Sequence, residues 1–173
     1  MTTNQPGQQL GKGMMVLAWV GALVILTAIF GNWEKRQINP NTSPESRIGN
    51  GIREVILEGN RRHHYVANGH INGTEVTFLL DTGASDVVIP ANIAQQLKLR
   101  PGARGYAMTA NGRVEVRATL IDKLQLGAIT LRNIKASINP GMRGGDILLG
   151  MSALKQVEFT QRGNQLTLRQ YGQ

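Results

Sequence analysis

The sequence of 173 residues contains no cysteine, and aromatic residues make up only 5% of it. The absence of cysteine excludes disulfide bonds, thiolate metal ligands and a cysteine nucleophile. The scarcity of aromatic side chains argues against a platform on which nucleic-acid bases stack. Acidic residues are also few, since 11 Asp and Glu stand against 19 Lys and Arg and leave a formal net charge of +8.

The basic residues are scattered along the chain rather than gathered into one stripe. Within residues 52–173 the tight cluster is Arg61-Arg62, which His63-His64 follows. Adjacent histidines without acidic or cysteine partners are typical of an exposed strand edge, so we expect neither a metal site nor a cofactor. A basic surface near anionic lipid headgroups explains the charge more simply than binding to nucleic acid does.

The N-terminal part of the chain combines a polar tail with a long apolar run. Residues 1–13 are polar and predicted to be disordered, and Met14–Phe30 carries no charge. With its flanks this run reaches the ~20 residues that a membrane-spanning helix requires, and we predict such a helix over 14–33. A cleaved signal peptide is the alternative. The run exceeds the ~7–15 residues of a signal core, however, and no Ala-x-Ala site follows, which favours an uncleaved anchor.

Residues 34–51 are polar, contain two prolines and show no apolar periodicity. This composition predicts a flexible linker. Orientation in the membrane is open from the residues themselves. Lys12 flanks one end of the apolar run and Lys35 with Arg36 the other, so the positive-inside rule leans slightly toward a cytoplasmic C-terminal domain.

Residues 52–173 alternate between short apolar runs and turn residues, which predicts one all-β domain, closed or sandwich-like. Two short helices are expected, at 91–99 and 152–157. Strands are expected at 54–57, 64–67, 75–80, 86–90, 114–120, 124–126, 129–138, 147–149, 157–159 and 165–168. Asn-Gly pairs favour tight hairpin turns, and they occur at Asn68-Gly69, Asn72-Gly73 and Asn111-Gly112.

One apolar strand leads directly into an acid. Phe78-Leu79-Leu80 is followed by Asp81-Thr82-Gly83-Ala84. A carboxylate at the end of a hydrophobic strand needs hydrogen bonds or a shifted pKa, because an isolated charge is costly to bury. An ordinary Asp-Thr-Gly turn is the alternative reading of these few residues.

Two further features follow in a fixed order. A hairpin over 108–114 has a glycine at its tip, and Ile147-Leu148-Leu149-Gly150 then precedes a short helix. In this order the chain resembles the retropepsin-like aspartic proteases over about residues 60–170. With its N-terminal apolar helix it is similar to a bacterial, membrane-anchored branch of that group. The resemblance implies a retropepsin-like closed β-barrel after a single membrane helix, and aspartic endopeptidase activity.

Peptide hydrolysis of this kind needs two carboxylates about 3 Å apart, which share a proton because they cannot both ionise easily. The chain has one Asp-Thr-Gly, and Asp86, Asp122 and Asp146 lack that setting. The dyad is therefore expected from Asp81 of two chains in a two-fold symmetric homodimer.

The resemblance also assigns roles around Asp81. Thr82 would bond across the two-fold axis, Gly83 would contact water or substrate, and Ala84 completes the active-site loop. A flap covering an extended peptide is expected from Thr109, Ala110, Asn111 and Gly112. Leu148, Leu149 and Gly150 would form a supporting segment.

Several alternatives remain at this point. A retropepsin-fold module could dimerise or bind peptides at the membrane without cleaving them, and a structural β domain could carry the Asp-Thr-Gly by chance. The resemblance places the domain on the outer side of a bacterial inner membrane, against the slight charge bias. Substrate, cleavage preference, dimer affinity, pH optimum and self-cleavage of the linker do not follow from the sequence.

Overall fold

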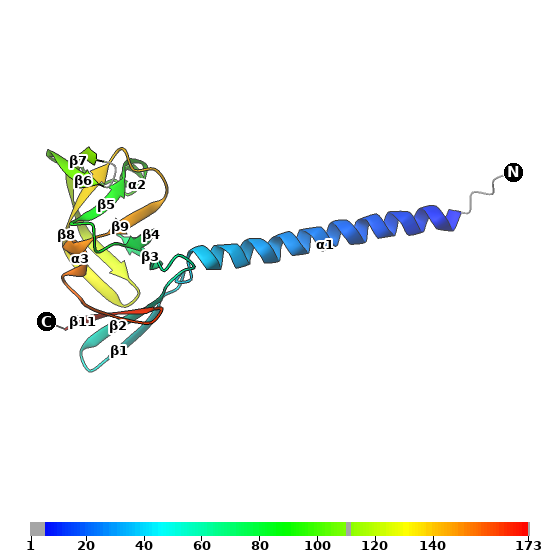
Figure 1. Ribbon diagram of the computed structural model, residues 1–173, viewed down its shortest axis with the longest axis horizontal. Coiled ribbons are helices and arrows are strands. Elements are labelled where there is room, and N and C mark those ends of the chain that lie inside the picture. Colours follow the sequence, from blue (N-terminus) through cyan, green and yellow to red (C-terminus); the bar gives the residue numbers. More distant parts are fainter. Residues whose placement is uncertain (1–5, 110–111, 173) are drawn as a thin grey trace. The chain divides into compact units, whose positions relative to one another are not determined.

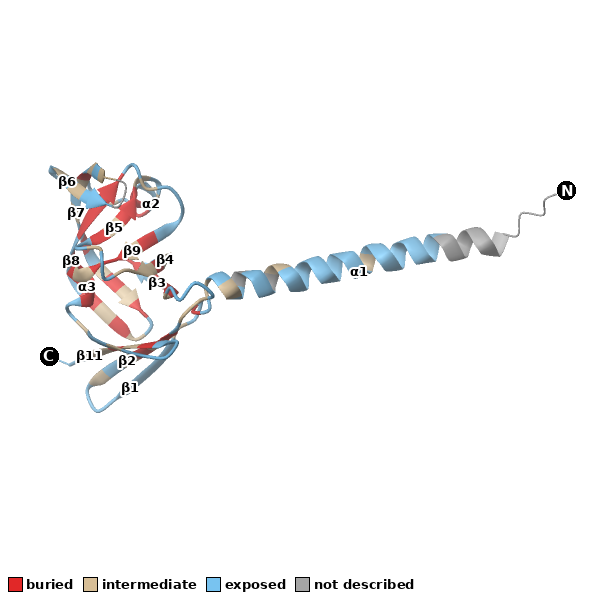
Figure 2. Ribbon diagram, viewed as in Figure 1, coloured by how far each residue is buried: buried red, intermediate tan, exposed pale blue. Residues whose placement is uncertain are grey.

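The computed structural model describes residues 6–109 and 112–172, and the chain divides into two compact units, Met1–Gln37 and Ile38–Gln173. Helix α1 (Pro6–Ile38) accounts for the described part of the first unit. Its segment Gly13–Ile38 has a mean hydropathy of 2.4 and is long enough to cross a membrane. Its large apolar side chains are exposed (Figure 2), as in a helix that faces lipid. The expected segment 14–33 lies within it.

Helix α1 begins earlier than the sequence predicts. Disorder is expected over 1–13, whereas the helix of the structure starts at Pro6. Proline is favourable at a first helical position because its missing N–H would have no partner there. A helix that is already formed in the apolar run also extends at little cost. Residues 1–5 lie outside the described part of the chain.

Part of the segment 34–51, where a flexible linker is expected, has regular secondary structure. Its first residues continue α1, and Glu45–Gly49 forms strand β1, which pairs antiparallel with β2 (Ile52–Glu58). Asn50 and Gly51 connect them with φ angles of 50° and 74°, which suit a tight hairpin. Every residue of β1 is exposed. The strand therefore lacks the alternation that identifies a half-buried strand in a sequence.

Asn41 fixes the start of the second unit. Its side chain is 4% exposed. The amide Nδ2 donates to the carbonyl oxygens of Glu58 (2.9 Å) and Val66 (2.7 Å), and Oδ1 accepts from the Glu58 amide at 2.7 Å. One buried side chain thus satisfies three backbone groups where β2 ends and where strand β3 begins.

The larger sheet has seven strands in the order β3-β4-β9-β5-β8-β7-β6, and an additional pairing of β3 with β7 closes it into a barrel. Pairing is parallel for β4 with β9 and for β5 with β8. The strands are β3 (Val66–Ile71), β4 (Thr74–Leu80), β5 (Val87–Pro90), β6 (Arg104–Thr109), β7 (Gly112–Leu126), β8 (Ile129–Asn139) and β9 (Asp146–Leu149). The expected closed, mostly β fold is confirmed.

The two short helices also occur, at Ala91–Gln96 (α2) and Met151–Leu154 (α3). Both are shorter than the sequence predicts. Residues 97–99 leave the α2 helix because Lys98 adopts a positive φ of 53°. That left-handed conformation cannot continue a right-handed helix.

The second sheet has four strands in the order β1-β2-β11-β10. It adds β10 (Glu158–Arg162) and β11 (Gln165–Tyr171) to the hairpin formed by β1 and β2. Strand β11 pairs with β2, so the beginning and the end of the second unit lie side by side (Figure 1, cyan and red). Val55 and Leu168 are opposite each other and buried.

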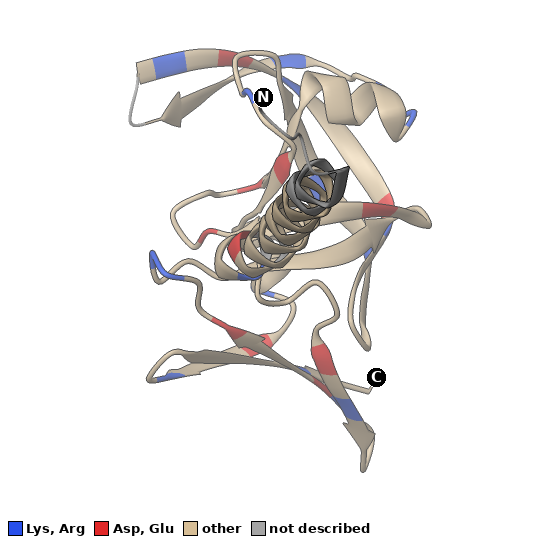
Figure 3. Ribbon diagram, turned by 90° about the vertical axis from the view of Figure 1, so that its right-hand side faces the viewer, with Lys and Arg blue, Asp and Glu red and all other residues tan. Residues whose placement is uncertain are grey.

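The outer face of this sheet carries cross-strand ion pairs. Arg169 Nε lies 2.7 Å from Glu54 Oε2, and Arg47 Nη1 lies 4.0 Å from Glu54 Oε1. Exposed pairs of this kind contribute about 0–1 kcal/mol each. Elsewhere on the second unit basic and acidic residues are interspersed over strands and loops (Figure 3), in agreement with the scattered charge of the sequence.

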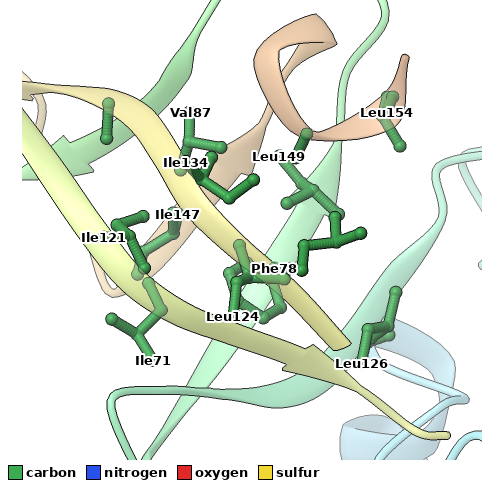
Figure 4. Close-up of a cluster of buried hydrophobic side chains, with 14 of the residues drawn as sticks. Ile71, Phe78, Val87, Ile121, Leu124, Leu126, Ile134, Ile147, Leu149 and Leu154 are labelled. Atoms are coloured by element: carbon green, nitrogen blue, oxygen red, sulfur yellow. The ribbon is translucent and has the colours of Figure 1, made fainter. Parts of the chain in front are cut away.

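One hydrophobic core fills the barrel (Figure 4). Its largest fully buried side chain is Phe78 of β4. Around it gather aliphatic side chains from β3, β5, β7, β8, β9 and α3, among them Ile71, Val87, Ile121, Leu124, Ile134, Ile147, Leu149 and Leu154.

The packing of the core explains why one Asn-Gly pair lies within a strand and not in the turn that the sequence predicts. Asn68-Gly69 is expected in a turn but lies inside β3, and Asn72-Gly73 makes the turn instead. A Cβ on Gly69 would overlap the Gln125 carbonyl oxygen and would lie 2.7 Å from the Phe78 ring. Glycine is needed there because backbone and ring approach closely.

Candidate active site

Asp81 follows the last residue of β4 and is held by short backbone contacts. Its amide donates to the Leu149 carbonyl oxygen at 3.2 Å, which extends the pairing of β4 with β9 by one residue. Its Oδ1 accepts a hydrogen bond of 2.8 Å from the Gly83 amide, and its carbonyl oxygen accepts one of 3.3 Å from Ala84. This local turn fixes the half-buried carboxylate at the surface end of the strand.

The supporting segment lies directly against this loop. Leu148 and Leu149 pair with the last two residues of β4. A Cβ on Gly150 would overlap the Asp86 carbonyl oxygen and would lie 2.6 Å from that of Ala84. Only glycine allows this approach, so the structure gives a physical reason for the Leu-Leu-Gly pattern.

The start of α3 continues the contact by hydrogen bonding. The Met151 amide donates to the Ala84 carbonyl oxygen at 2.8 Å, and the Ser152 amide donates to that of Ser85 at 2.9 Å. The loop after Asp81 therefore supplies acceptors for the first amides of a helix that have no intrahelical partner.

Ser152 is a site-supporting residue that the sequence does not single out. It is 9% exposed, and its Oγ accepts from the Val87 amide at 3.0 Å and donates to the Lys135 carbonyl oxygen at 2.8 Å. These bonds join α3 to β5 and β8 around the base of the Asp81 loop. The feature that marks it in the sequence is its position directly after Gly150-Met151. Its hydrogen-bond partners, Val87 and Lys135, are distant in sequence and do not follow from that position.

Asp81 and Thr82 line a pocket of about 300 Å³. The other lining residues are mostly apolar: Tyr65, Leu80, Leu154, Phe159, Gln161, Leu166 and Leu168. Burial raises the pKa of the Tyr65 phenol, and the charge of Glu58 raises it further. Thr82 is exposed, and within the described chain its hydroxyl makes no hydrogen bond, nor does Asp81 Oδ2.

The expected flap corresponds to the hairpin of β6 and β7. Thr109 and Gly112 are opposite each other, and the Thr109 hydroxyl donates to the Gly112 carbonyl oxygen at 2.9 Å. Ala110 and Asn111, also expected in the flap, lie outside the described residues. Among the described residues the Asp81 pocket is lined by none from this hairpin.

The two faces of the β6–β7 hairpin have different surroundings. The Arg113 guanidinium lies over the Tyr106 ring, 3.7 Å from its centroid, on the exposed face. On the other face, a Cβ on Gly141 would lie 3.6 Å from Val114. Val114, two residues after Gly112 in this hairpin, thus lies close to the turn that follows β8.

The remaining acids stand apart from Asp81. Asp122 and Asp146 are exposed on β7 and β9. Asp86 lines a second pocket, of about 240 Å³, which Thr82 and Gly83 also line but Asp81 does not. His63 and His64 are exposed in the loop before β3. The described ranges contain no group of three His, Asp or Glu side chains that could hold a metal ion.

Comparison with known proteins agrees with this geometry. The family model described as "gag-polyprotein putative aspartyl protease" matches residues 67–156. An uncharacterized protein from the region 5′ of cobV in a Sinorhizobium species is 31% identical over 161 residues, which cover 90% of this chain and 69% of that protein. An uncharacterized protein of Rickettsia prowazekii is 27% identical over 132 residues, covering 74% of this chain but only 56% of the relative.

Among solved structures, a retropepsin-like aspartic protease from Rickettsia conorii superposes with a TM-score of 0.60 at 25% identity. The match covers 75% of this chain and 97% of that one. A closed barrel with an acid at the end of β4 and a Leu-Leu-Gly strand against it fits the aspartic protease class that both comparisons name. The chain belongs to the retropepsin-like aspartic protease family.

Proposed function

We propose that the protein is an aspartic endopeptidase whose catalytic dyad is formed by Asp81 from two copies of the chain. The observation that carries this proposal is the state of the Asp81 loop. Its backbone is held by the Leu149 carbonyl oxygen and the Gly83 amide, while one carboxylate oxygen has no partner within the described chain. A rigid loop that presents a single carboxylate at the surface suits a site completed by its own symmetry mate.

The chemistry follows from two carboxylates that share one proton. The ionised Asp81 takes a proton from a water molecule as the water oxygen attacks the peptide carbonyl carbon. The protonated Asp81 of the other copy gives its proton to the carbonyl oxygen. The tetrahedral intermediate then collapses with cleavage of the C–N bond. The Asp81 that took the proton from water gives it to the leaving nitrogen, and the other Asp81 regains its proton from a hydroxyl group of the intermediate. The dyad titrates as a unit, so its two pKa values belong to the pair.

The surrounding residues have supporting roles in this proposal. The Thr82 hydroxyl, exposed and without a partner in the described chain, is available to bond across the two-fold axis. Gly83 and Ala84 form the loop under the substrate, and the β6–β7 hairpin acts as the flap that excludes water. Leu148, Leu149 and Gly150 hold the loop from below.

Helix α1 adds a membrane anchor to the proposal. Two protease domains attached to one membrane meet at a higher effective concentration than in solution, so even a weak dimer is active there. We place the domain on the outer side of a bacterial inner membrane. A single cysteine introduced at exposed Ser43 tests this, because a membrane-impermeant maleimide should label it in intact cells only if the domain is outside.

Asp81→Asn is the decisive variant for catalysis. The asparagine amide oxygen can still accept the Gly83 N–H, so the loop and the dimer should remain while peptide cleavage falls at least ~10³-fold. Asp86→Asn, an exposed acid five residues later, is the matched control and should cleave normally. Undiminished proteolysis by Asp81→Asn would overturn the assignment. A wild-type protein that dimerises and binds peptides without cleaving them would identify a binding module instead.

A further inference from the structure

The loop between β2 and β3, residues 59–65, is built around the side chain of Asn60. Its Oδ1 accepts hydrogen bonds from the amides of Arg62 (2.9 Å) and His64 (3.0 Å), and its backbone amide donates to the His64 carbonyl oxygen at 2.8 Å. An Asn side chain that bonds to the amide two residues later forms an Asx turn. His63 adopts a left-handed φ of 59° within this turn. The loop is therefore held in shape by its own hydrogen bonds.

The tip of this loop, residues 61–64, carries basic and imidazole side chains. Four consecutive side chains are exposed there: Arg61, Arg62, His63 and His64. Residues 59–74 contain no acid, and Glu58, directly before the loop, already accepts a hydrogen bond of 2.7 Å from Gln165. Among the described residues no acid forms an ion pair with Arg62. This basic tip therefore presents guanidinium groups to solvent, and their geometry matches the oxygen atoms of a phosphate.

The loop lies beside the residue at which the apolar helix ends. Asn60 Nδ2 donates to the Ile38 carbonyl oxygen at 3.1 Å. Ile38 is the last residue of α1 and the first residue of the second unit. It lies about 7–8 Å further along the helix than Trp33, and tryptophan is enriched at membrane surfaces. The headgroup layer is itself about 5–8 Å thick on each side of a bilayer. When α1 spans a membrane, the basic tip is therefore at the level of the headgroups.

We propose that the basic tip binds the phosphate groups of anionic phospholipids in the membrane that holds α1. This rests on the membrane anchor of the proposed function, because the anchor brings the tip to the headgroups. Basic side chains next to a membrane helix are attracted to anionic headgroups, and one guanidinium group can donate two hydrogen bonds to one phosphate. A nucleic acid would need a longer basic stripe than one loop with four such side chains provides.

The same loop connects the headgroups with the candidate catalytic acid. Tyr65 follows the basic tip directly, and its carbonyl oxygen accepts a hydrogen bond of 3.0 Å from the Leu80 amide. Leu80 directly precedes Asp81, and Tyr65 and Asp81 line one pocket. Two backbone hydrogen bonds and two peptide links thus join Asn60 to Asp81. A basic tip that is bound to lipid holds the Asp81 pocket close to the membrane surface.

The first test measures the binding of single lipids to the full chain in detergent by native mass spectrometry. Phosphatidylglycerol, which is anionic, should bind more tightly than zwitterionic phosphatidylcholine. Arg61→Gln combined with Arg62→Gln should weaken phosphatidylglycerol binding by about 10-fold or more and leave phosphatidylcholine binding unchanged. Arg100→Gln combined with Arg143→Gln removes the same charge at two exposed positions elsewhere and is the matched control. Equal losses in the two double variants would show an effect of net charge alone and overturn the proposal.

The second test maps the contact in the wild-type chain, so it decides the question even if the double variant does not fold. The chain is reconstituted in nanodiscs whose phosphatidylglycerol carries a photoreactive diazirine in its headgroup. After illumination, cross-links located by mass spectrometry should fall within residues 59–65. Excess inorganic phosphate should not reduce them, because free phosphate is not concentrated at the membrane surface. Cross-links confined to α1, or loop cross-links that phosphate abolishes, would overturn the assignment of the tip to lipid headgroups.

The lipid proposal and the proposed function fail in different ways. A chain that enters nanodiscs and cleaves peptides but gives no cross-link within residues 59–65 overturns the lipid site and leaves the endopeptidase assignment intact. Loop cross-links in a chain that cleaves nothing support the lipid site and overturn the assignment of activity. A chain that does not enter a bilayer overturns the anchor and the lipid site together.

Discussion

The hydroxyl of Ser152 accepts a hydrogen bond of 3.0 Å from the backbone amide of Val87, which lies 65 residues earlier in the chain. The same hydroxyl donates to the Lys135 carbonyl oxygen at 2.8 Å. One small side chain therefore ties α3 to β5 and β8 at the base of the Asp81 loop. The geometry of the site therefore depends on a residue that takes no part in the proposed peptide hydrolysis.

Ser152→Ala should destabilise the domain by about 1–3 kcal/mol, because it leaves the Val87 amide and the Lys135 carbonyl without their partner. Chemical denaturation measures the loss. Ser43→Ala, at an exposed serine, is the control and should change stability by less than about 0.5 kcal/mol. Equal stability of the two variants would mean that solvent replaces both bonds.

Gly150→Ala should be more damaging than its one added methyl group suggests. The Cβ would overlap the Asp86 carbonyl oxygen and press on that of Ala84, so either the Asp81 loop or α3 must move. We expect a loss of about 2–3 kcal/mol in stability, together with reduced peptide cleavage. Gly145→Ala, where nothing lies within 4 Å of the added atom, is the matched control. Similar melting temperatures for both variants would contradict the close approach.

Asn41→Ala should loosen the start of the second unit. It removes three hydrogen bonds and leaves the Glu58 amide and the carbonyl oxygens of Glu58 and Val66 unpaired, at a cost of about 2–3 kcal/mol. Hydrogen exchange should speed up at the Glu58 amide. Thr42→Ala, next to it and exposed, should leave that exchange rate as it is. Unchanged protection in Asn41→Ala would mean that this amide does not depend on the side chain.

Stability should fall at alkaline pH through Tyr171. Its hydroxyl donates to Glu158 Oε2 at 2.6 Å, and this hydrogen bond raises the pKa of the phenol above its ordinary value of 10.0. Because the pKa is higher in the folded state than in the unfolded state, the protonated phenol stabilises the folded protein below pH 10. This contribution to the free energy of unfolding is lost as the pH rises through the folded-state pKa. The free energies of unfolding of the wild type and Tyr171→Phe, measured from neutral to alkaline pH, should thus converge at high pH. A gap that persists at high pH would contradict this origin.

The sequence predicts local features of the site well and distant ones poorly. The strand into Asp81, the β6–β7 hairpin and both short helices follow from apolar runs, Asn-Gly pairs and helical spacing, which act over a few residues. Strand β1 and Asn41 fall in the predicted linker because their order comes from pairing with β2 and β3, not from apolar residues of their own. The role of Ser152 does not follow from the sequence for a related reason, since it depends on hydrogen bonds to Val87 and Lys135.

The pairing of β2 with β11 sets the order of events during synthesis. Strand β11 lies between β2 and β10, so the four-stranded sheet cannot form until residues through Tyr171 have left the ribosome. Helix α1 emerges first and can enter the membrane while the rest is still being made. Val55 and Leu57 of β2 cannot pair with Leu168 and Leu166 until β11 has been synthesised. The proposed membrane anchor is therefore made before the four-stranded sheet of the second unit is complete.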